Sequence, residues 1–498
     1  MTKKRRHRRN NVNATQKATL NKDAAGSEEV GDRLSKLPND ILLNILERVD
    51  TLDAIRTCIL SKRMMKLCTK LSQFFLSCSS IPDHNVKTNS EYVRTNSAVA
   101  HVTDNILSTR SPEITISKLK IRFILMQPDC YTIGKSVART MATQKVGAAE
   151  FEIITEKIHK KCSPADLLDH AKQFNDFFSA CVDAFAGLKR LWLRNMRFGE
   201  LDIPNILSTC KLLESLRLTN CDSGMNSVVQ LEHAKLTELE VEYGKFEIVE
   251  LTCLPKLQRV SYKGWFNSHK GPLYFGFVPQ LSKLRLTKIG TRPTRTLELS
   301  QLLGNVPHIG NLHLDFQSEK IWVLPESPKL LRPVLSQLQQ VNLDNLSEGC
   351  DLAWTMFILE AAPSLKELCI TVLDHWCNMV MRDKDFRKNN GFCEKADVEW
   401  KPPPPPPPPD FKHKNLVKLT IYGFQPDDIF VRFIRCVMEH AVNMAEISLH
   451  DRKKVCLHCG VLDPEMKYPS RYPRNADERT HITEELGRSL PAMVRFWT

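Results

Sequence analysis

The hydrophobic pattern is clearest between Asp32 and Leu71, where three short segments carry apolar residues at helical spacing with almost no connecting sequence. Pro38 suits the first position of the first helix, and Ser61 can cap the third. Three helices of roughly two to three turns bury too little apolar surface to fold well alone. We therefore predict a small helical unit that packs against a partner. Its first helix has one apolar face, at positions i, i+3, i+4 and i+7, formed by Leu42, Ile45, Leu46 and Val49.

From Ile114 onward a different pattern begins, in which a triplet of the form apolar-x-x-apolar-x-apolar recurs towards the C-terminus. Such a triplet fits a short strand whose apolar side chains point to one side of a sheet. The strict leucine forms begin at Leu188, Leu213 and Leu281, and relaxed forms begin at Ile116, Leu236, Leu257, Ile309, Leu338, Leu365, Leu416 and Met444.

The spacing of the triplets indicates a repeat architecture. Successive triplets between Leu188 and Leu365 start 21 to 29 residues apart, which is the range of leucine-rich repeats. A conventional α/β domain is the alternative, but its helices need longer connections than several of these gaps provide. We predict an α/β fold in which the short three-helix unit is followed by an irregular leucine-rich-repeat solenoid with a parallel concave sheet. Proline precedes four triplets in the same place, at Pro255, Pro279, Pro307 and Pro363.

Residues 32–76 resemble an F-box, the helical module that docks onto the small Skp-family adaptor of SCF ubiquitin ligases. The resemblance rests on the Leu37-Pro38 opening, the Asp-Ala-Ile-Arg turn at 53–56 and the Ser-Lys-Arg run at 61–63. It implies that the chain joins a cullin-RING ligase through that adaptor, whereas an ordinary helical hairpin is the alternative. The residues expected to contact the adaptor are Leu37, Pro38, Ile41, Leu42, Ile45, Leu46, Leu52 and Ile55.

The third helix departs from the family pattern. F-boxes of this kind usually carry tryptophan after the basic pair and near the end of the third helix, where this chain has Met64 and Cys68. Methionine fills apolar space flexibly but buries less area than an indole ring. We therefore expect the first helix to contribute most of the adaptor binding.

The triplets resemble the irregular leucine-rich repeats of plant F-box proteins, including those grouped with FBD-type tails, and with the F-box the resemblance covers roughly residues 32–460. It implies that the concave face selects a protein target. The outward residue of each triplet should line that face, and the mixture of charged, aromatic and amide groups suits a protein surface better than a nucleic-acid groove. The candidate target-binding residues are Trp192, Arg217, Glu240, Arg285, His313 and Asn342.

These patterns divide the chain into five regions with one excursion. The excursion is expected at about 376–411 and includes eight consecutive prolines, 402–409, which favour polyproline II and are alternatively a ligand for an SH3- or WW-like partner. The regions are a disordered basic arm (1–31), the F-box (32–76), a linker with a short helix (77–113), the solenoid (114–455) and a C-terminal tail (456–498).

Composition and charge narrow the classes of function. With 498 residues, 42% hydrophobic and 26% charged, the chain is globular and exceeds one compact core. Of the net charge of +13, the first 22 residues carry +8 and leave +5 for the rest, so a nucleic-acid partner is not expected. The arm is either a solvated end or a nuclear localisation signal, and we expect a nuclear or cytoplasmic location, or both. The residues of this signal are Lys3, Lys4, Arg5, Arg6, Arg8 and Arg9.

The sequence indicates neither a membrane span nor a catalytic motif. No run of about eighteen apolar residues occurs, so we expect no membrane partner. Without an export signal, the 16 cysteines are expected to be reduced thiols. The Cys456–Cys459 pair lacks two further ligands at finger spacing, so we predict no metal and no cofactor.

No phosphate-binding glycine loop or nucleophile elbow appears, and we predict a non-catalytic substrate-recognition subunit of a ubiquitin ligase. The alternative is a nuclear interaction scaffold that uses its repeats without ubiquitin transfer.

Overall fold

The computed structural model describes most of the chain. The described residues are 36–49, 51–57, 60–78, 89–158, 161–224, 227–265, 271–288, 296–306, 308–317, 321–346, 350–373, 407–451, 471–487 and 493–497. The basic arm, Cys456 and Cys459, and prolines 402–406 lie outside these ranges.

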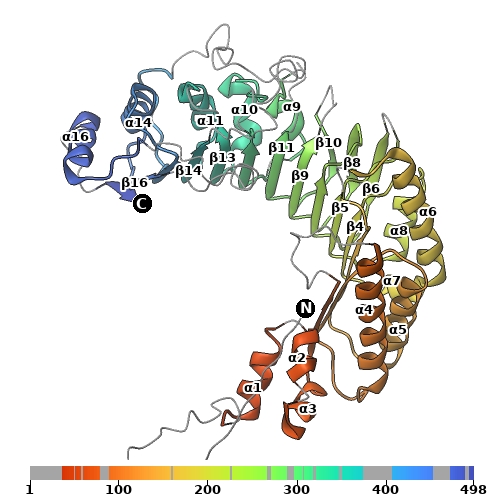
Figure 1. The fold of residues 1–498 in the computed structure, drawn as a ribbon. Helices are drawn as coiled ribbons and strands as arrows, with labels where there is room; N and C mark the ends of the chain where they lie inside the picture. Colours follow the sequence, from red (N-terminus) through yellow and green to blue (C-terminus); the bar gives the residue numbers. More distant parts are fainter. Residues whose placement is uncertain are drawn as a thin grey trace, which may run out of the picture.

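Three short helices form the N-terminal end of the structure: α1 (Asn39–Leu46), α2 (Thr51–Thr57) and α3 (Lys62–Cys68). Pro38 is the N-cap of α1, one position earlier than predicted, and α1 ends before Val49. Ser61 caps α3 as expected, because its hydroxyl accepts a hydrogen bond from the Met64 N–H at 3.1 Å. The helices lie at one end of a curved solenoid (Figure 1).

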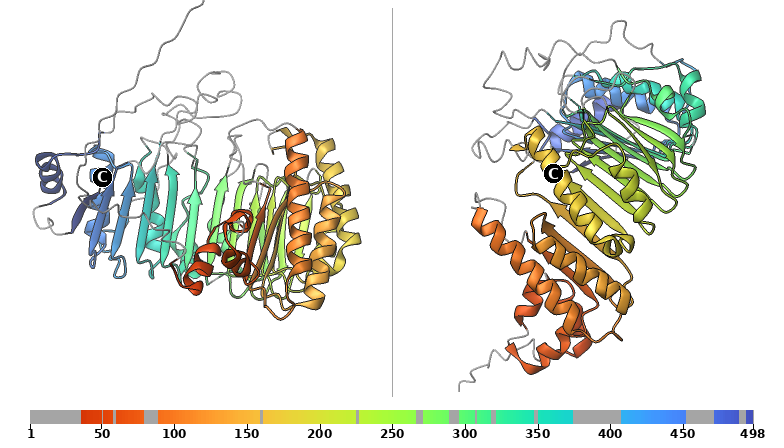
Figure 2. Two further views of the ribbon diagram at one scale, coloured as in Figure 1. Left: turned by 60° about the horizontal axis from the view of Figure 1, so that its bottom comes forward. Right: turned by 90° about the vertical axis from the view of Figure 1, so that its right-hand side faces the viewer.

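One long parallel sheet runs through the whole molecule and forms the inner wall of the arc (Figures 1 and 2). The last two apolar residues of every triplet identified in the sequence lie on one of its strands, and the first lies just before the strand, which confirms the predicted α/β solenoid. In spatial order the strands are β1 (Gln73–Ser77), β2 (Lys118–Ile124), β3 (Ala149–Ile154), β4 (Arg190–Arg194), β5 (Ser215–Thr219), β7 (Glu238–Glu242), β9 (Arg259–Trp265), β11 (Lys283–Lys288), β12 (Asn311–Asp315), β13 (Gln340–Leu346), β14 (Glu367–Val372), β15 (Lys418–Tyr422), β16 (Glu446–His450) and β17 (Val494–Trp497).

The outer layer of the arc consists of helices at both ends and of a second sheet in the middle. Repeats of 25 to 29 residues return through a helix, whereas the three repeats of 21 to 24 residues have room only for a strand. These three strands, β6 (Val228–Glu232), β8 (Ile248–Cys253) and β10 (Leu273–Phe277), form a parallel sheet of their own. The outer helices are α4 (Asn89–Thr109), α5 (Asp129–Thr143), α6 (Pro164–Ala180), α7 (Val182–Ala186), α8 (Asp202–Thr209), α9 (Leu299–Leu303), α10 (Pro328–Leu335), η3 (Leu352–Thr355), α11 (Met356–Ala361), α14 (Asp428–His440) and α16 (Ala476–Leu486).

The prolines that precede the triplets close tight turns. In each of three repeats the N–H of the first leucine donates to the carbonyl three residues earlier, with proline as the second residue of the turn. These bonds join Leu257 to Leu254, Leu281 to Val278 and Leu365 to Ala362, at 3.1 Å each. The fourth proline, Pro307, lies outside the described residues.

The predicted boundaries differ from the structure at both ends of the solenoid. β1 already belongs to the sheet, so the sheet begins within the F-box region and not at residue 114. The expected linker with a short helix contains α4, which is 21 residues long. At the other end, the expected tail supplies α16 and the last strand, β17. The first triplet is out of line with the others by two residues. Its outward residue is Lys120, but the residue of β2 that lies in the same row as Trp192 is Arg122.

Two buried histidines, His233 and His413, replace the proline turn in repeats that lack it. In each, Nδ1 accepts backbone N–H groups of the same turn, at 3.1 Å from Lys235 and at 2.9 Å from Leu416. Nε2 therefore carries the proton and donates to a carbonyl of the preceding repeat, at 3.0 Å (Cys210) and 2.9 Å (Ala362). Burial is the main cause that lowers the pKa of both rings, opposed by the bond to the carbonyl.

We predict that these two histidines make the fold sensitive to acid. Because their pKa values are lower in the folded than in the unfolded chain, the folded chain binds fewer protons, and stability should fall as pH drops below about 6.5. A His233→Gln/His413→Gln variant should start less stable but lose less of its thermal midpoint between pH 7.5 and pH 5.5. The exposed His101→Gln change serves as the control. An equal loss in the double variant and the wild type would contradict the prediction.

Candidate functional site

The F-box helices expose a group of apolar side chains. Ile41 and Ile45 on α1 are 45% and 39% exposed, and Leu60, just before α3, is 74% exposed. With Val49 and Met65, which are also exposed, they make up what we call the F-box apolar patch. Side chains of this size in water indicate an interaction surface when they gather on one small unit.

The predicted adaptor-binding residues divide into two groups. Ile41, Ile45 and Pro38 are exposed, whereas Leu37, Leu52 and Ile55 are half-buried. The remaining two, Leu42 and Leu46, are only 1% and 4% exposed and belong to the core. They support the F-box from inside and are not available to a partner. The helical period alone does not say which side of α1 faces the rest of the chain.

Three members of the patch were missed from the sequence. Val49 was placed on the apolar face of the first helix, but it lies beyond the end of α1 and is 43% exposed. Leu60 directly precedes the polar run Ser61-Lys62-Arg63, and Met65 lies beside Lys66 within α3. An apolar residue beside a cap or between charged residues is the signal that would have identified them.

The start of α3 is held against the start of α1. The Arg63 side chain donates from Nη2 to the Leu37 carbonyl at 2.5 Å and from Nε to Oδ1 of Asn39 at 2.8 Å. Met64 and Cys68, at the places where tryptophan was expected, are half-buried and pack against the core. Cys68 is disulfide-bonded, contrary to the expectation of reduced thiols throughout, whereas the ten other described cysteines are free.

The six predicted target-binding residues lie in a single row across the concave sheet. The register pairs Trp192 with Arg217, Arg217 with Glu240, Arg285 with His313 and His313 with Asn342. Ser261 of β9 links the two halves, because it pairs with both Glu240 and Arg285. The apolar members of the same strands are buried on the other side, so this row faces the inner surface of the arc. The structure thus brings all six together.

Trp192 is embedded in this row. The guanidinium groups of Arg217 and Arg122 lie 4.4 and 5.1 Å from the ring centroid, and Nε1 donates to the Thr219 hydroxyl at 2.9 Å. These contacts immobilise the indole and occupy much of its surface. A partner would therefore meet a preorganised cluster of arginine and indole and not a free tryptophan.

Most charges in the N-terminal half of the row are paired with each other. Arg217 contacts Glu240 at 3.3 Å and Glu242 at 2.8 Å, and Arg122 contacts Glu152 at 3.4 Å. Burial is the main cause that raises the pKa of Glu240, with Arg217 acting in the opposite direction. The arrangement presents alternating charge along the sheet, which favours a partner with a complementary pattern.

The other half of the row is more open. Arg285 is exposed, and its nearest carboxylate, that of Asp315, is 4.0 Å away. His313 lies 2.8 Å from Oδ2 of Asp344. Asn342 completes this part with an amide that both donates and accepts hydrogen bonds.

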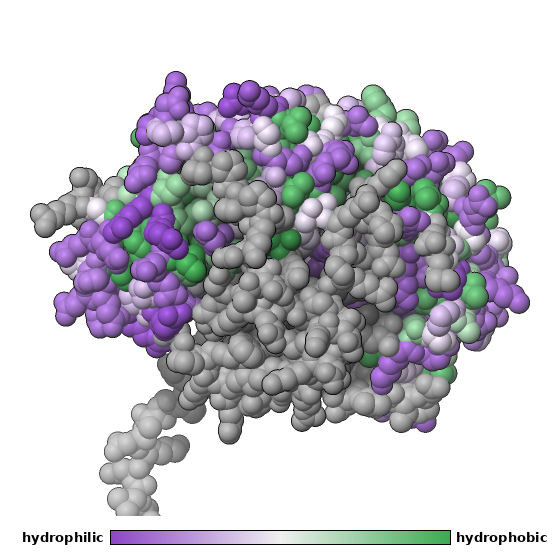
Figure 3. Space-filling view, turned by 90° about the horizontal axis from the view of Figure 1, so that it is seen from above, coloured by the Kyte–Doolittle hydropathy of each residue, from purple (hydrophilic) through white to green (hydrophobic). Residues whose placement is uncertain are grey.

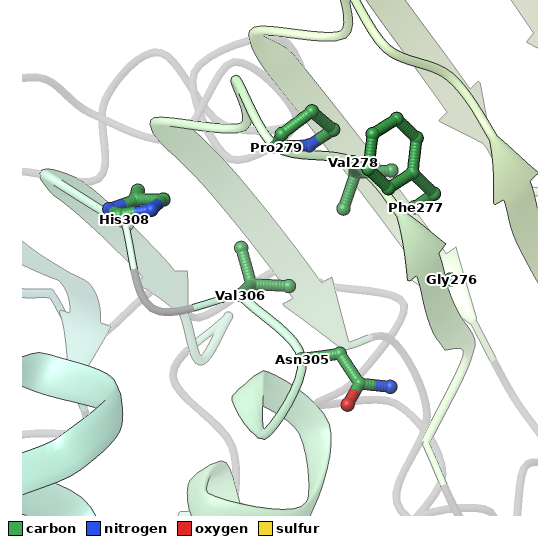
Figure 4. Close-up of a pocket in the computed structure, with 7 residues that line it drawn as sticks. All are labelled: Gly276, Phe277, Val278, Pro279, Asn305, Val306 and His308. Atoms are coloured by element: carbon green, nitrogen blue, oxygen red, sulfur yellow. The ribbon is translucent and has the colours of Figure 1, made fainter.

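Outside these two surfaces the described residues offer little for chemistry. A shallow pocket of about 220 Å³ lies where β10 and α9 end, with Phe277, Val278, Pro279 and Val306 on its walls (Figure 4). Its polar groups are Asn305, which donates to the Phe275 carbonyl at 2.9 Å, and His308. Within the described ranges, no three His, Cys, Asp or Glu side chains gather as metal ligands would.

The visible surface is mostly polar. Seen from above, hydrophilic residues cover most of the described surface, with smaller hydrophobic patches between them (Figure 3). Among the described helices, none combines the length and apolar character needed to cross a bilayer.

The architecture and two family models define the class of protein. Residues 34–76 match the F-box domain model, and residues 176–465 match the model described as "At1g61320/AtMIF1, LRR domain". The chain is an F-box protein with a leucine-rich-repeat solenoid. Since the second model covers more than half of its length, it belongs to the At1g61320/AtMIF1 leucine-rich-repeat family.

Relatives in Arabidopsis thaliana share this combination of domains. The F-box/FBD/LRR-repeat protein At5g22610 is 23% identical over 44% of this chain and 43% of its own length, and At5g56420, of the same description, is 25% identical over 57% and 65%. The F-box/FBD/LRR-repeat protein At1g13570 is 26% identical over 69% of this chain and 85% of its own. The chain thus spans less than two thirds of the first two relatives.

One solved structure, of the Toll–Spatzle complex from Drosophila, aligns with 74% of this chain and 60% of that chain at 9% identity. Its TM-score is 0.22, so this likeness carries no weight beside the family models.

Proposed function

We propose that this protein is the substrate-recognition subunit of an SCF-type ubiquitin ligase. The observation that carries the proposal is the F-box apolar patch, which leaves Ile41 and Ile45 exposed on a domain that matches the F-box model. Because Ile41 and Ile45 are 45% and 39% exposed, burying the rest of both side chains against a Skp-family adaptor would contribute about 1–2.5 kcal/mol. A cullin-RING assembly would then be reached through the adaptor.

In this proposal the concave row selects a protein target. It presents preorganised arginine and indole groups beside alternating charges, which are features of protein interfaces. The contribution of the chain is proximity, because it would hold the target near the catalytic subunits of the ligase. A nuclear location stays a prediction, because the basic arm lies outside the described residues.

The test is capture of a purified Skp-family adaptor by the full chain. An Ile41→Ser/Ile45→Ser variant should keep its fold, because it leaves the core residues Leu42 and Leu46 unchanged, and should bind the adaptor about tenfold more weakly. The matched control is Leu201→Ser/Leu330→Ser, which removes two exposed leucines from the outer layer of the solenoid.

Equal capture by wild type and the isoleucine variant, or no capture by the wild type, would overturn the proposal. In that case a non-ligase scaffold becomes the better reading, and the lifetime of a bound protein should then not depend on the proteasome.

A further inference from the structure

The first strand of the sheet has an outer edge that is closed by the F-box. The Cys78 N–H donates to Arg122 of β2, and the Ser72 carbonyl accepts from Ser117, so the even-numbered residues of this strand face β2. The odd-numbered residues therefore point their backbone groups away from the sheet. The Phe75 N–H is one of these, and it donates to the hydroxyl of Thr51 on α2 at 2.6 Å. Thr51 is only 3% exposed, which is unusual for a polar residue at the start of a helix.

A second contact joins the end of α1 to the start of the same strand. Oε1 of Glu47 accepts hydrogen bonds from the Ser72 N–H at 2.9 Å and from the Ser72 hydroxyl at 2.7 Å. Bonds to a carboxylate are stronger than those between neutral groups. Glu47, the C-cap of α1, and Thr51, the first residue of α2, thus hold the start of the sheet at Ser72 and at Phe75.

The charge of Glu47 also matters to a buried cation. Arg110, which follows α4, is 7% exposed, and its Nε and Nη2 find no hydrogen-bond partner among the described residues. Its guanidinium lies 5.0 Å from the Phe74 ring. Burial lowers the pKa of Arg110, and the negative charge of Glu47 opposes that shift.

The hydrophobic core passes through the junction without a break. Leu46 of α1, Ala54 of α2 and Leu67 of α3 belong to the same buried cluster as Phe74 and Leu76 of β1. Only four residues separate the end of α3 from the start of β1. A flexible linker has no room here.

We propose that the F-box is the N-terminal cap of the solenoid and that Glu47 and Thr51 are positioning residues, which fix the direction of the F-box apolar patch relative to the concave row. An open strand edge needs a cap, and here the cap is the docking module itself. The consequence for ubiquitin transfer rests on the proposed function: adaptor and target would be held at one fixed separation. The role of the F-box as a cap does not depend on the proposed function.

The experiment measures the separation of the two parts in the full chain. Spin labels carried by unnatural amino acids at the exposed positions Lys66 and Lys366 avoid the native cysteines. A Glu47→Ala/Thr51→Val variant should broaden the distance distribution at least about twofold, because the cap becomes free to turn on the first strand. Hydrogen exchange in residues 72–77 should accelerate about tenfold or more, whereas exchange in α4 and α5 should not change.

Two controls separate positioning from folding. The Asp53→Ala/Thr57→Val variant likewise removes one carboxylate and one hydroxyl from the F-box. The Asp53 carboxylate contacts Arg56 and the Thr57 hydroxyl donates to the Ala54 carbonyl, both within α2, so this variant should keep the narrow distribution. The Thr51→Ser variant keeps the hydroxyl and should therefore keep the narrow distance distribution that Thr51→Val loses.

The outcomes are distinguishable from those of the adaptor test. Broadening in the junction variant with undiminished adaptor capture supports the proposal. A distribution as narrow as in the wild type, equal broadening in the control, or unfolding of α4 and α5 together with the F-box would overturn it. If the wild type captures no adaptor, the proposed function fails, while the distance distribution still decides the role of the junction.

Discussion

Replacing Gly423 with alanine should destabilise the solenoid by about 3–5 kcal/mol, one of the largest effects expected of any single methyl group in this chain. Gly423 follows β15 with a φ of 76°, a left-handed conformation that costs an alanine roughly 1–2 kcal/mol. A Cβ there would also fall on the carbonyl oxygen of Val372 at the end of β14. The two strands would have to separate, and the backbone oxygen has no alternative position.

Three other glycines separate the two causes. Gly224→Ala tests conformation alone, because its φ is 99° but no described residue other than its chain neighbours lies within 4 Å of the added atom. Gly147→Ala tests the clash alone, since a Cβ would lie 2.7 Å from the Ser117 carbonyl oxygen. Gly310→Ala has neither problem, because its nearest neighbour, the Ser282 carbonyl oxygen, is 3.8 Å away.

Denaturant midpoints of the four variants provide the measurement. The loss at Gly423 should approach the sum of the losses at Gly224 and Gly147, and Gly310→Ala should stay within about 0.5 kcal/mol of the wild type. A Gly423 variant as stable as the Gly310 variant would show that the end of β14 can move, and that this part of the sheet is less rigid than its register implies.

The sheet could be predicted from the sequence because it depends on a local pattern. Each triplet places two apolar side chains on one face of a strand, and neighbouring repeats must bury them together. Leu191 and Leu216 are paired in the register, which forces Trp192 and Arg217 into one row on the opposite face. The candidate target-binding row therefore followed from the strand period.

The rest depends on contacts between distant residues. Whether Ile41 or Leu42 faces solvent depends on how α1 packs against α3, which begins about twenty residues further along the chain. Strand β1 had no triplet to reveal it. The second sheet was missed because a strand and a short helix of alternating apolar residues look alike in five residues, as at Val228–Glu232. The edge of β1 is closed by a hydrogen bond between a backbone N–H and the Thr51 hydroxyl. Such a bond between polar groups cannot be predicted from a pattern of hydrophobic residues.

Asn195 is a further position that no periodicity reveals, and its replacement by alanine should cost about 3–4 kcal/mol. It follows β4, is fully buried and has a φ of 59°, which asparagine tolerates better than most residues. Its Nδ2 donates to the Thr155 hydroxyl at 2.6 Å and to the Lys157 carbonyl at 2.7 Å. Its Oδ1 accepts from Nδ2 of Asn220, the equivalent residue after β5, at 2.8 Å. Alanine would remove all three hydrogen bonds and leave Nδ2 of Asn220 without this acceptor, whereas the Thr155 hydroxyl would keep its bond to the Lys157 carbonyl at 3.2 Å.

A double-mutant cycle with Asn220→Ala isolates the bond between the two repeats. The coupling should be about 1 kcal/mol, because the second substitution removes a donor that the first has already orphaned. Asn205→Ala on the exposed side of α8 is the matched control and should change stability by less than about 0.5 kcal/mol. Asn195→Gly, which accepts the left-handed backbone, should recover only the conformational part of the loss.

The same substitution reaches the concave face, because β4 carries Trp192 and β5 carries Arg217. If the asparagines hold the ends of these strands in register, Asn195→Ala should also loosen the contact between the indole and the guanidinium group. The tryptophan fluorescence should then shift. A Trp192→Phe variant gives the fluorescence of the other tryptophans for comparison. An additive cycle with unchanged fluorescence would mean that water replaces the lost bonds and that the row keeps its order without them.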